Sequence, residues 1–144
     1  MIVEQLVRAQ RRGVKVHVLT RPPHSLKTEK LIEGVTGLRI MHDVGVKIHK
    51  LKHLRLHGKV WLADDLHAIV GSINLSPGSF DTRRELAIEV HDSEVLHRLR
   101  KVLHDDWKES LPLDLTDQGL LADLQKHHKK GAGSLGLVVN PGTQ

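Results

Sequence analysis

Hydrophobic and polar residues in the first part of the chain follow a helical period and then an alternating one. Residues 2–12 repeat apolar side chains on one side of a helix, and Gly13 is a suitable helix stop. Residues 14–19 alternate as a strand, with a valine at every second position, beginning at Val14, turned inward. A helix, a glycine and a strand in this order indicate an α/β unit.

A pair of prolines then breaks the pattern, which resumes in two shorter pieces. Ser25 is placed to cap a short helix that runs to about Ile32. Residues 38–41, which follow Gly37, form an apolar run that predicts a second strand.

The middle of the chain predicts a hairpin with one polar face. If residues 56–62 form a strand, the period of two places His57 and Lys59 on one face and apolar residues on the other. An Asp-Asp turn then leads into the apolar run 68–70, which predicts the returning strand.

Two more polar residues follow the returning strand. Beyond Gly71 the same period sets Ser72 and Asn74 side by side, so the hairpin brings four polar side chains together. A nucleophile, a fixed cation and two neutral donors that converge suit a phosphate diester, whose negative charge must be held while phosphorus is attacked. The pattern therefore indicates a phosphate-handling site.

The last third of the chain predicts a strand and two helices. Residues 85–90 alternate with their apolar members inward, which leaves the Glu85 carboxylate on the other side. Asp92 and the serine after it can cap a helix that covers the sheet, and residues 113–126 predict a further short helix. Residues 127–130 form a basic cluster.

Length and composition limit the class of protein. The 144 residues suffice for one domain, expected over residues 1–130, with a flexible glycine-containing tail over 131–144. No apolar run is long enough for a membrane span. The absence of cysteine agrees with a reducing compartment, so we expect a cytoplasmic protein.

The charge of the chain favours an anionic partner. A formal net charge of +5 suits either nucleic acid or the surface of an acidic membrane, to which the protein would bind peripherally. Only three aromatic residues are present, which counts against a dedicated single-strand binder because such proteins stack bases on aromatic side chains.

The spacing of the polar residues resembles the signature of the phospholipase D superfamily, His-x-Lys-x4-Asp-x6-Gly-Ser-x-Asn. All six specified positions match, at His57, Lys59, Asp64, Gly71, Ser72 and Asn74. The resemblance continues through Ser79 and Glu85 and extends more loosely to Trp107. It implies an α/β fold with a mixed sheet flanked by helices. Members normally carry a strand before the first helix, so the sheet of this chain is expected to lack that strand.

The resemblance also implies roles for the matched residues. His57 would attack phosphorus and form a phosphohistidine intermediate. The phosphate oxygens would be bound by three residues, Lys59, Ser72 and Asn74. Glu85 would accept a hydrogen bond from the second nitrogen of the His57 ring and so orient it. No cofactor is implied.

Four further residues would have lesser parts. Asp64 and Gly71 would serve the structure of the motif, Asp64 by supporting the hairpin turn. Arg83 and Arg84 are candidates for contacts with a substrate phosphate. Arg83 is also a departure, because many members carry Asn at its position.

The substrate class has three alternatives. Residues 71–81 and 83–90 resemble the phospholipase and cardiolipin-synthase-like branch, which makes phospholipid the first substrate to expect, in hydrolysis or phosphatidyl transfer. A nuclease acting on DNA or RNA is the second alternative. A catalytically incomplete fragment that only binds anions is the third.

The chain holds a single copy of the signature. Cleavage through a covalent histidine needs an acid on the far side of phosphorus to protonate the leaving oxygen. In the family a second copy of the motif supplies that group. We therefore expect either a homodimer with paired His57 residues or an amino-terminal half that this chain lacks.

A zinc site is the competing explanation of the histidines. His49, His53 and His57 are four residues apart, which on a helix would form a stripe able to hold the metal. Gly45 and β-branched residues weaken such a helix, and no carboxylate stands at zinc-motif spacing. We expect no metal, and interpret His49 and His53 as part of a basic face that attracts anions.

Overall fold

The computed structural model describes residues 2–127 and divides the chain into two compact units. We call Leu51–Ser110 the hairpin unit, and Val3–Lys50 with the segment from Leu111 onward the core unit. The expected tail over 131–144, and the basic cluster 127–130 apart from His127, lie outside the described residues. The expected single domain over 1–130 stays a prediction.

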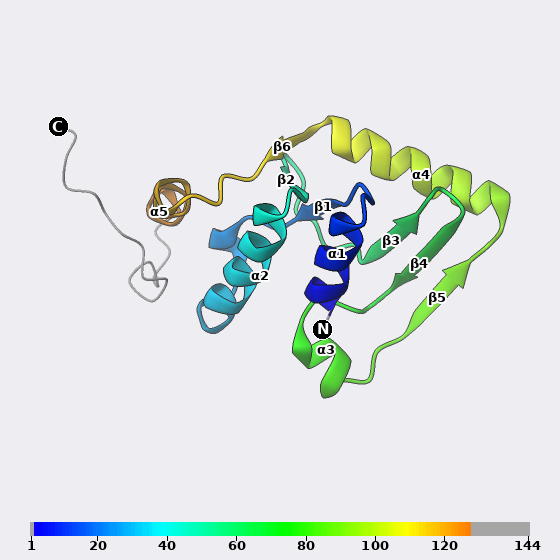
Figure 1. Ribbon diagram of the computed structural model, residues 1–144, viewed down its shortest axis with the longest axis horizontal. Helices are drawn as coiled ribbons and strands as arrows, with labels where there is room; N and C mark the ends of the chain where they lie inside the picture. Colours follow the sequence, from blue (N-terminus) through cyan, green and yellow to red (C-terminus); the bar gives the residue numbers. More distant parts are fainter. Residues whose placement is uncertain (1, 128–144) are drawn as a thin grey trace. The chain divides into compact units, whose positions relative to one another are not determined.

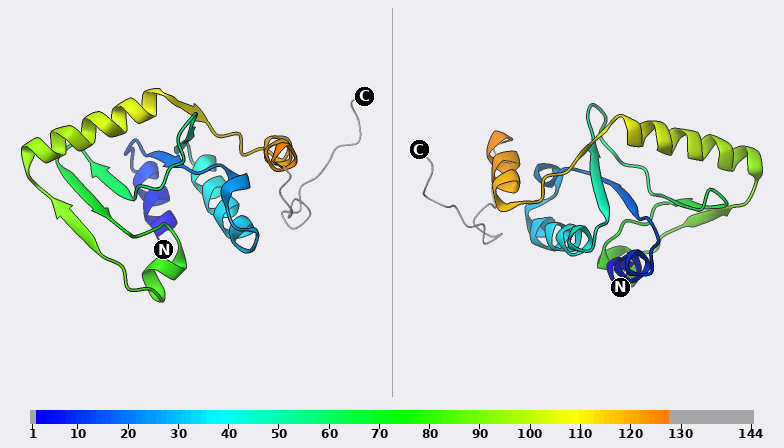
Figure 2. Two further views of the ribbon diagram at one scale, coloured as in Figure 1. Left: turned by 180° about the vertical axis from the view of Figure 1, so that it is seen from behind. Right: turned by 45° about the horizontal axis from the view of Figure 1, so that its top comes forward.

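The core unit contains helices and a small sheet (Figure 1). Its helices are α1 (Ile2–Arg11), α2 (Leu31–Asp43) and α5 (Asp117–Lys126), with 3-10 turns η1 (Pro23–Ser25) and η2 (Thr28–Lys30). The strands β1 (His17–Thr20), β2 (Lys47–Leu51) and β6 (Ser110–Pro112) are ordered β1-β2-β6. Strands β1 and β2 are parallel. Helices α1 and α2 lie on the same side of this sheet (Figure 2).

The core unit buries one contiguous hydrophobic cluster. Leu31, Leu120 and Leu124 are 0% exposed and come from α2 and α5. Eleven buried residues belong to this cluster, all of them in the core unit. Burial of such side chains is the main source of stability in a small protein.

Two sequence predictions in the core unit were wrong. Residues 38–41 belong to α2 rather than to a strand, because the buried positions of this helix recur three or four residues apart, which is a helical period. Gly37 lies within α2, and α2 is followed by Gly45 at a φ of 93°. The helix expected from Ser25 is replaced by η1 and η2.

The first elements follow the sequence more closely. Helix α1 is confirmed, and Gly13 after it has a φ of 94°, a conformation that side chains disfavour. The following strand begins only at His17, and Val14 is exposed rather than inward. The predicted helix over 113–126 is shorter, beginning at Asp117.

The hairpin unit is an antiparallel meander followed by a long helix (Figure 1). Strands β3 (Val60–Ala63), β4 (His67–Gly71) and β5 (Ala87–Val90) are ordered β3-β4-β5. The short helix α3 (Pro77–Asp81) lies between β4 and β5, and α4 (Ser93–Lys108) follows. As predicted, Asp92 caps α4, its carboxylate accepting from the backbone nitrogens of Glu94 and Val95 at 3.0 and 2.9 Å.

Two strand predictions in the hairpin unit need correction. The first strand begins at Val60, so His57 and Lys59 precede it on a segment of irregular backbone. The last begins at Ala87, and Leu86 and Ile88 are 76% and 65% exposed rather than inward. Strand β5 is the outer strand of its sheet, and the three-stranded sheet leaves these side chains open to solvent.

The α/β class with flanking helices is confirmed, with the strands divided between two small sheets. Among residues 2–127, no helix combines the length and the apolar character that crossing a bilayer requires.

Candidate active site

The signature residues all lie in the hairpin unit. Their segments are joined by the β3–β4 turn, where Asp64 and Asp65 have φ of 53° and 56°, a left-handed conformation that aspartate tolerates better than most residues. Asp65 also lies 3.6 Å from Arg100 of α4, which ties this turn to the long helix. Asp64 lies in this turn, and the supporting role expected for it stays a prediction.

His57 and Lys59 contact one another directly. The Lys59 Nζ lies 3.0 Å from the His57 Nδ1 and donates to the His57 carbonyl oxygen at 2.6 Å. The Lys59 carbonyl in turn accepts from the Gly71 backbone nitrogen at 3.1 Å, which holds this segment beside β4. The same Nζ lies 3.5 Å from the His57 Nε2, so the amine is close to both ring nitrogens.

Gly71 is required where β4 meets the chain before β5. A Cβ atom at this position would lie 2.3 Å from the Leu86 carbonyl oxygen, much closer than such atoms can approach. Glycine therefore permits the two backbones to pair at the point where Ser72 follows. The role of Gly71 in the motif stays a prediction.

Ser72 is held by the chain that leads into β5. Its backbone nitrogen donates to the Leu86 carbonyl at 2.9 Å, and its hydroxyl accepts from the Leu86 nitrogen at 3.1 Å. The same hydroxyl donates to the Glu85 carboxylate. The structure thus joins two residues that are thirteen positions apart in the sequence.

The Glu85 carboxylate lies among hydrogen-bond donors and positive charges. Hydrogen bonds from Ser72, and next from Ser79, hold the pKa of Glu85 below its ordinary value, and the charges of Arg83 and Lys59 act in the same direction. The pKa of Glu85 therefore depends on Lys59, from the first part of the motif, and on Ser72, from its last part. The contact predicted between Glu85 and the His57 ring stays a prediction.

Sequence reasoning gave no role to Ser79, which the structure places at the centre of this group. Ser79 is 4% exposed, and its hydroxyl accepts from the Asn74 backbone nitrogen at 3.3 Å. It therefore fixes the loop that carries Asn74 as well as stabilising the Glu85 carboxylate. The sequence signal for Ser79 is that the resemblance to the superfamily continues through it.

The remaining candidate residues are Asn74, Arg83 and Arg84. The side chains of Asn74 and Arg84 are exposed to solvent. Arg83 is also exposed, and its charge acts on Glu85. Both arginines are thus accessible to an anion near this group.

The helical zinc stripe considered above does not form. His49 lies in β2, and the segment that carries His53 and His57 has no helix. Among the described residues, the groups with metal-binding geometry involve other histidines.

Comparisons with known proteins agree with this geometry. Residues 1–107 match the family model described as the cardiolipin synthase, PLD-like domain. The chain belongs to the phospholipase D superfamily. Its fold is also similar to that of a phospholipase D family member, Nuc, from Salmonella typhimurium, with a TM-score of 0.62 and 19% identity, over 77% of this chain and 72% of that chain.

The chain is similar to two kinds of curated relative, a cardiolipin synthase and an exonuclease. Cardiolipin synthase B of Escherichia coli is 31% identical over 103 residues, which cover 69% of this chain and 24% of that protein. The 5′-3′ exonuclease PLD3 of Xenopus tropicalis is 30% identical over 113 residues, covering 78% of this chain and 23% of that protein. The chain therefore matches about a quarter of the length of each relative.

Proposed function

We propose that this chain contributes a phosphodiesterase or phosphatidyltransferase site in which His57 is the nucleophile. The observation that carries the proposal is the pairing of His57 with Lys59, and of Ser72 with Glu85, within the matched signature. A histidine nucleophile in contact with a lysine side chain suits attack on a phosphate diester.

The proposed reaction has two steps. A nitrogen of His57 bonds to phosphorus while the bond from phosphorus to the leaving oxygen breaks, and that oxygen takes a proton from an acid. Water or an alcohol then attacks phosphorus, the P–N bond breaks, and the acceptor proton passes to a base. Phosphate oxygens that engage Lys59 would draw its amine from the His57 ring.

We propose phospholipid as the substrate class. Large hydrophobic side chains are exposed at four positions that lie near the motif residues in the sequence: Leu54, Leu75, Phe80 and Leu86. Leu75 follows Asn74 directly, and Leu86 follows Glu85. Apolar groups beside a phosphate site suit a lipid headgroup with acyl chains attached, and the likeness to cardiolipin synthase B supports the same choice. A cytoplasmic protein bound peripherally to anionic membranes would meet this substrate.

A nuclease is the second candidate, and a specific relative favours it. The likeness to an exonuclease is about as strong as that to the synthase. The net charge of +5 suits nucleic acid as well as an acidic membrane.

We further propose that the acid for the leaving oxygen comes from a second copy of the motif on another chain. The hairpin unit exposes several large apolar side chains, including Leu66, Ile69 and Ile88, that a partner could cover. A second copy of this chain is one such partner, and an amino-terminal half supplied separately is another. Without either, the chain would bind anions but turn over poorly.

The substrate test uses phosphatidylglycerol vesicles beside single-stranded DNA, both in chelator. We expect release or transfer of the phosphatidyl group from the vesicles. The rate of this reaction should fall by at least about a thousandfold in His57→Asn. The matched control is His53→Asn, an exposed histidine four residues earlier, which should keep full activity. Cleavage of DNA alone would favour the nuclease, and activity retained in His57→Asn would exclude His57 as the nucleophile.

The two-motif proposal is tested by activity and molecular mass across dilution. Activity per chain should fall as a dimer dissociates. Full activity in a monodisperse monomer would contradict the requirement, whereas an inactive monomer at every concentration would point to a separate half.

A further inference from the structure

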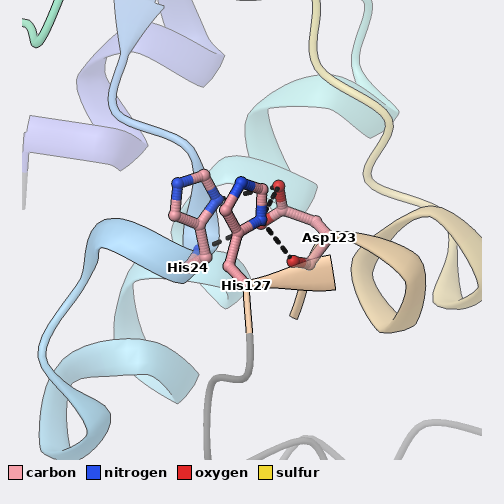
Figure 3. A group of neighbouring side chains, drawn as sticks. All are labelled: His24, Asp123 and His127. Carbon is pink, nitrogen blue, oxygen red and sulfur yellow. Dashed lines mark hydrogen bonds and ion pairs between the residues drawn. The ribbon is translucent and has the colours of Figure 1, made fainter. Parts of the chain in front are cut away.

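A second cluster of chemical groups lies in the core unit, where η1 meets α5 (Figure 3). It consists of His24 on η1, Asp123 on α5 and His127 at the end of that helix. Each offers one ligand atom, and the three atoms lie within 4.8 Å of one another. Asp123 and His127 are four residues apart, so they share one face of the helix.

The carboxylate at the centre of this cluster is largely buried and already oriented. The Asp123 side chain is 13% exposed and that of His24 is 24% exposed. One oxygen, Oδ2, accepts from the His24 backbone nitrogen at 3.0 Å, and the other, Oδ1, lies 2.9 Å from the His24 Nδ1. The His127 Nδ1 lies 3.8 Å from the same Oδ1. The same Nδ1 lies 2.8 Å from the Asp123 backbone carbonyl oxygen, so the His24 ring is the one that bonds to the carboxylate directly.

Charge at this cluster favours a cation as its ligand. The two imidazole rings are stacked, with centroids 3.5 Å apart and planes at 11°. A largely desolvated carboxylate next to two histidine nitrogens offers the donor set that zinc and similar ions prefer.

We propose that His24, Asp123 and His127 bind a divalent transition-metal ion, with Zn²⁺ as the reference metal. The Oδ1 of Asp123 would be the oxygen ligand, because Oδ2 is engaged by the His24 backbone. The two ring planes are nearly parallel and 3.5 Å apart, so one ion cannot lie in both, and the more exposed His127 must turn for both nitrogens to reach it. That turn would exchange the stacking on His24 and the hydrogen bond to the Asp123 carbonyl oxygen for the bond to the metal.

None of the three proposed metal ligands belongs to the phosphodiesterase signature. Asp123 and His127 lie beyond residue 107, where the match to the family model ends. The metal would join η1 to α5 and so stabilise the core unit, since an ion that binds only the folded state adds to its stability.

A second group, His67, Glu89 and His91 in the hairpin unit, serves as an internal comparison. Its side chains are 59%, 57% and 62% exposed, and each is free to hydrate. Its members also have metal-binding geometry, but no buried carboxylate orients them. Removing two of its histidines is therefore the matched control.

The test titrates Zn²⁺ into the full chain by calorimetry and repeats thermal unfolding with and without the ion. We expect one tight equivalent and a rise in Tm for the wild type. Asp123→Asn and His127→Ala should each weaken binding by at least about tenfold, since even the loss of an outer partner of a metal ligand has an effect of this size. The double variant His67→Ala/His91→Ala should bind like the wild type.

Two outcomes would overturn the proposal. One is zinc affinity unchanged in both Asp123→Asn and His127→Ala. The other is the absence of a binding equivalent, or its loss in the double variant His67→Ala/His91→Ala. His127→Ala replaces an exposed side chain at a helix end, so circular dichroism should show an intact fold.

Discussion

The core unit and the hairpin unit differ in where their apolar side chains lie. In the core unit, residues such as Leu31 and Leu124 are completely buried, and the contiguous cluster belongs to this unit alone. In the hairpin unit, Ala68 and Leu96 are the buried hydrophobic residues among those described, while Leu86 and Ile88 are mostly exposed. The candidate active site lies in the unit with the less developed core.

The unit that contains the buried hydrophobic cluster is therefore not the unit that contains the candidate active site. A unit with its own buried cluster can hold its fold through hydrophobic burial, whereas one with exposed apolar faces gains most from a partner or a lipid surface. The signature residues depend on polar contacts and close backbone pairing, as at Ser72 and Gly71, rather than on burial. Substitutions in the two units should therefore have different effects.

The largest expected difference is in stability. Leu31→Ala should lower the free energy of unfolding by about 2–5 kcal/mol, because it leaves a cavity among fully buried side chains. Leu86→Ala should change it by less than about 0.5 kcal/mol, because that side chain is exposed. Urea unfolding measures both, and a large loss for Leu86→Ala would show that the hairpin unit is covered in solution.

A second difference concerns activity. Ser72→Ala should reduce kcat/KM about a hundredfold, a typical cost of removing one donor from a charged site. It also removes the hydrogen bond that contributes most to the lowered pKa of Glu85. That pKa should rise toward its ordinary value, so the acid limb of the pH profile moves to higher pH.

Ser93→Ala, on the exposed first turn of α4, is the matched control for Ser72→Ala. It should leave kcat/KM and the acid limb unchanged. An unshifted acid limb in Ser72→Ala would mean that the ionisation of Glu85 does not control the reaction.

The smallest effect is a pH dependence of stability in the core unit. Burial first, and then the nearby charges of His17 and Lys47, lower the pKa of His49. The unfolded chain then takes up this proton more readily than the folded one, so stability falls as pH drops through the ordinary value of 6.5 toward the lower folded pKa. His49→Gln should flatten this decline, and His53→Gln should not, as measured by Tm between pH 7.5 and 5 in steps of about half a unit.

The sequence predicted those elements whose local signals agree with their packing. Helix α1 has an apolar side and a glycine stop, and α4 has an aspartate cap that the structure confirms. Helix α2 was missed because Gly34 and Gly37 weaken its helical pattern, while the burial of Leu38 depends on contacts with the rest of the core unit.

The candidate site was found from spacing, not from the predicted strands. His57 and Lys59 were assigned to a strand, yet they precede β3, and their contact comes from an irregular segment. Ser79 lies within the resemblance, but its role could not be predicted because it depends on how α3 folds back toward Asn74 and Glu85. Periodicity describes faces of regular elements and carries no information on such loop contacts.

The central claim is that His57 carries the reaction, and trapping its intermediate tests this most directly. Bis(p-nitrophenyl) phosphate is a suitable substrate, because p-nitrophenolate leaves without a proton and so removes the need for a second motif. After an alkaline quench, mass spectrometry should find a nitrophenyl-phosphoryl group on the peptide containing His57, in the wild type and in His53→Asn but not in His57→Asn. Release of p-nitrophenolate with the adduct on another residue, or undiminished in His57→Asn, would contradict the account.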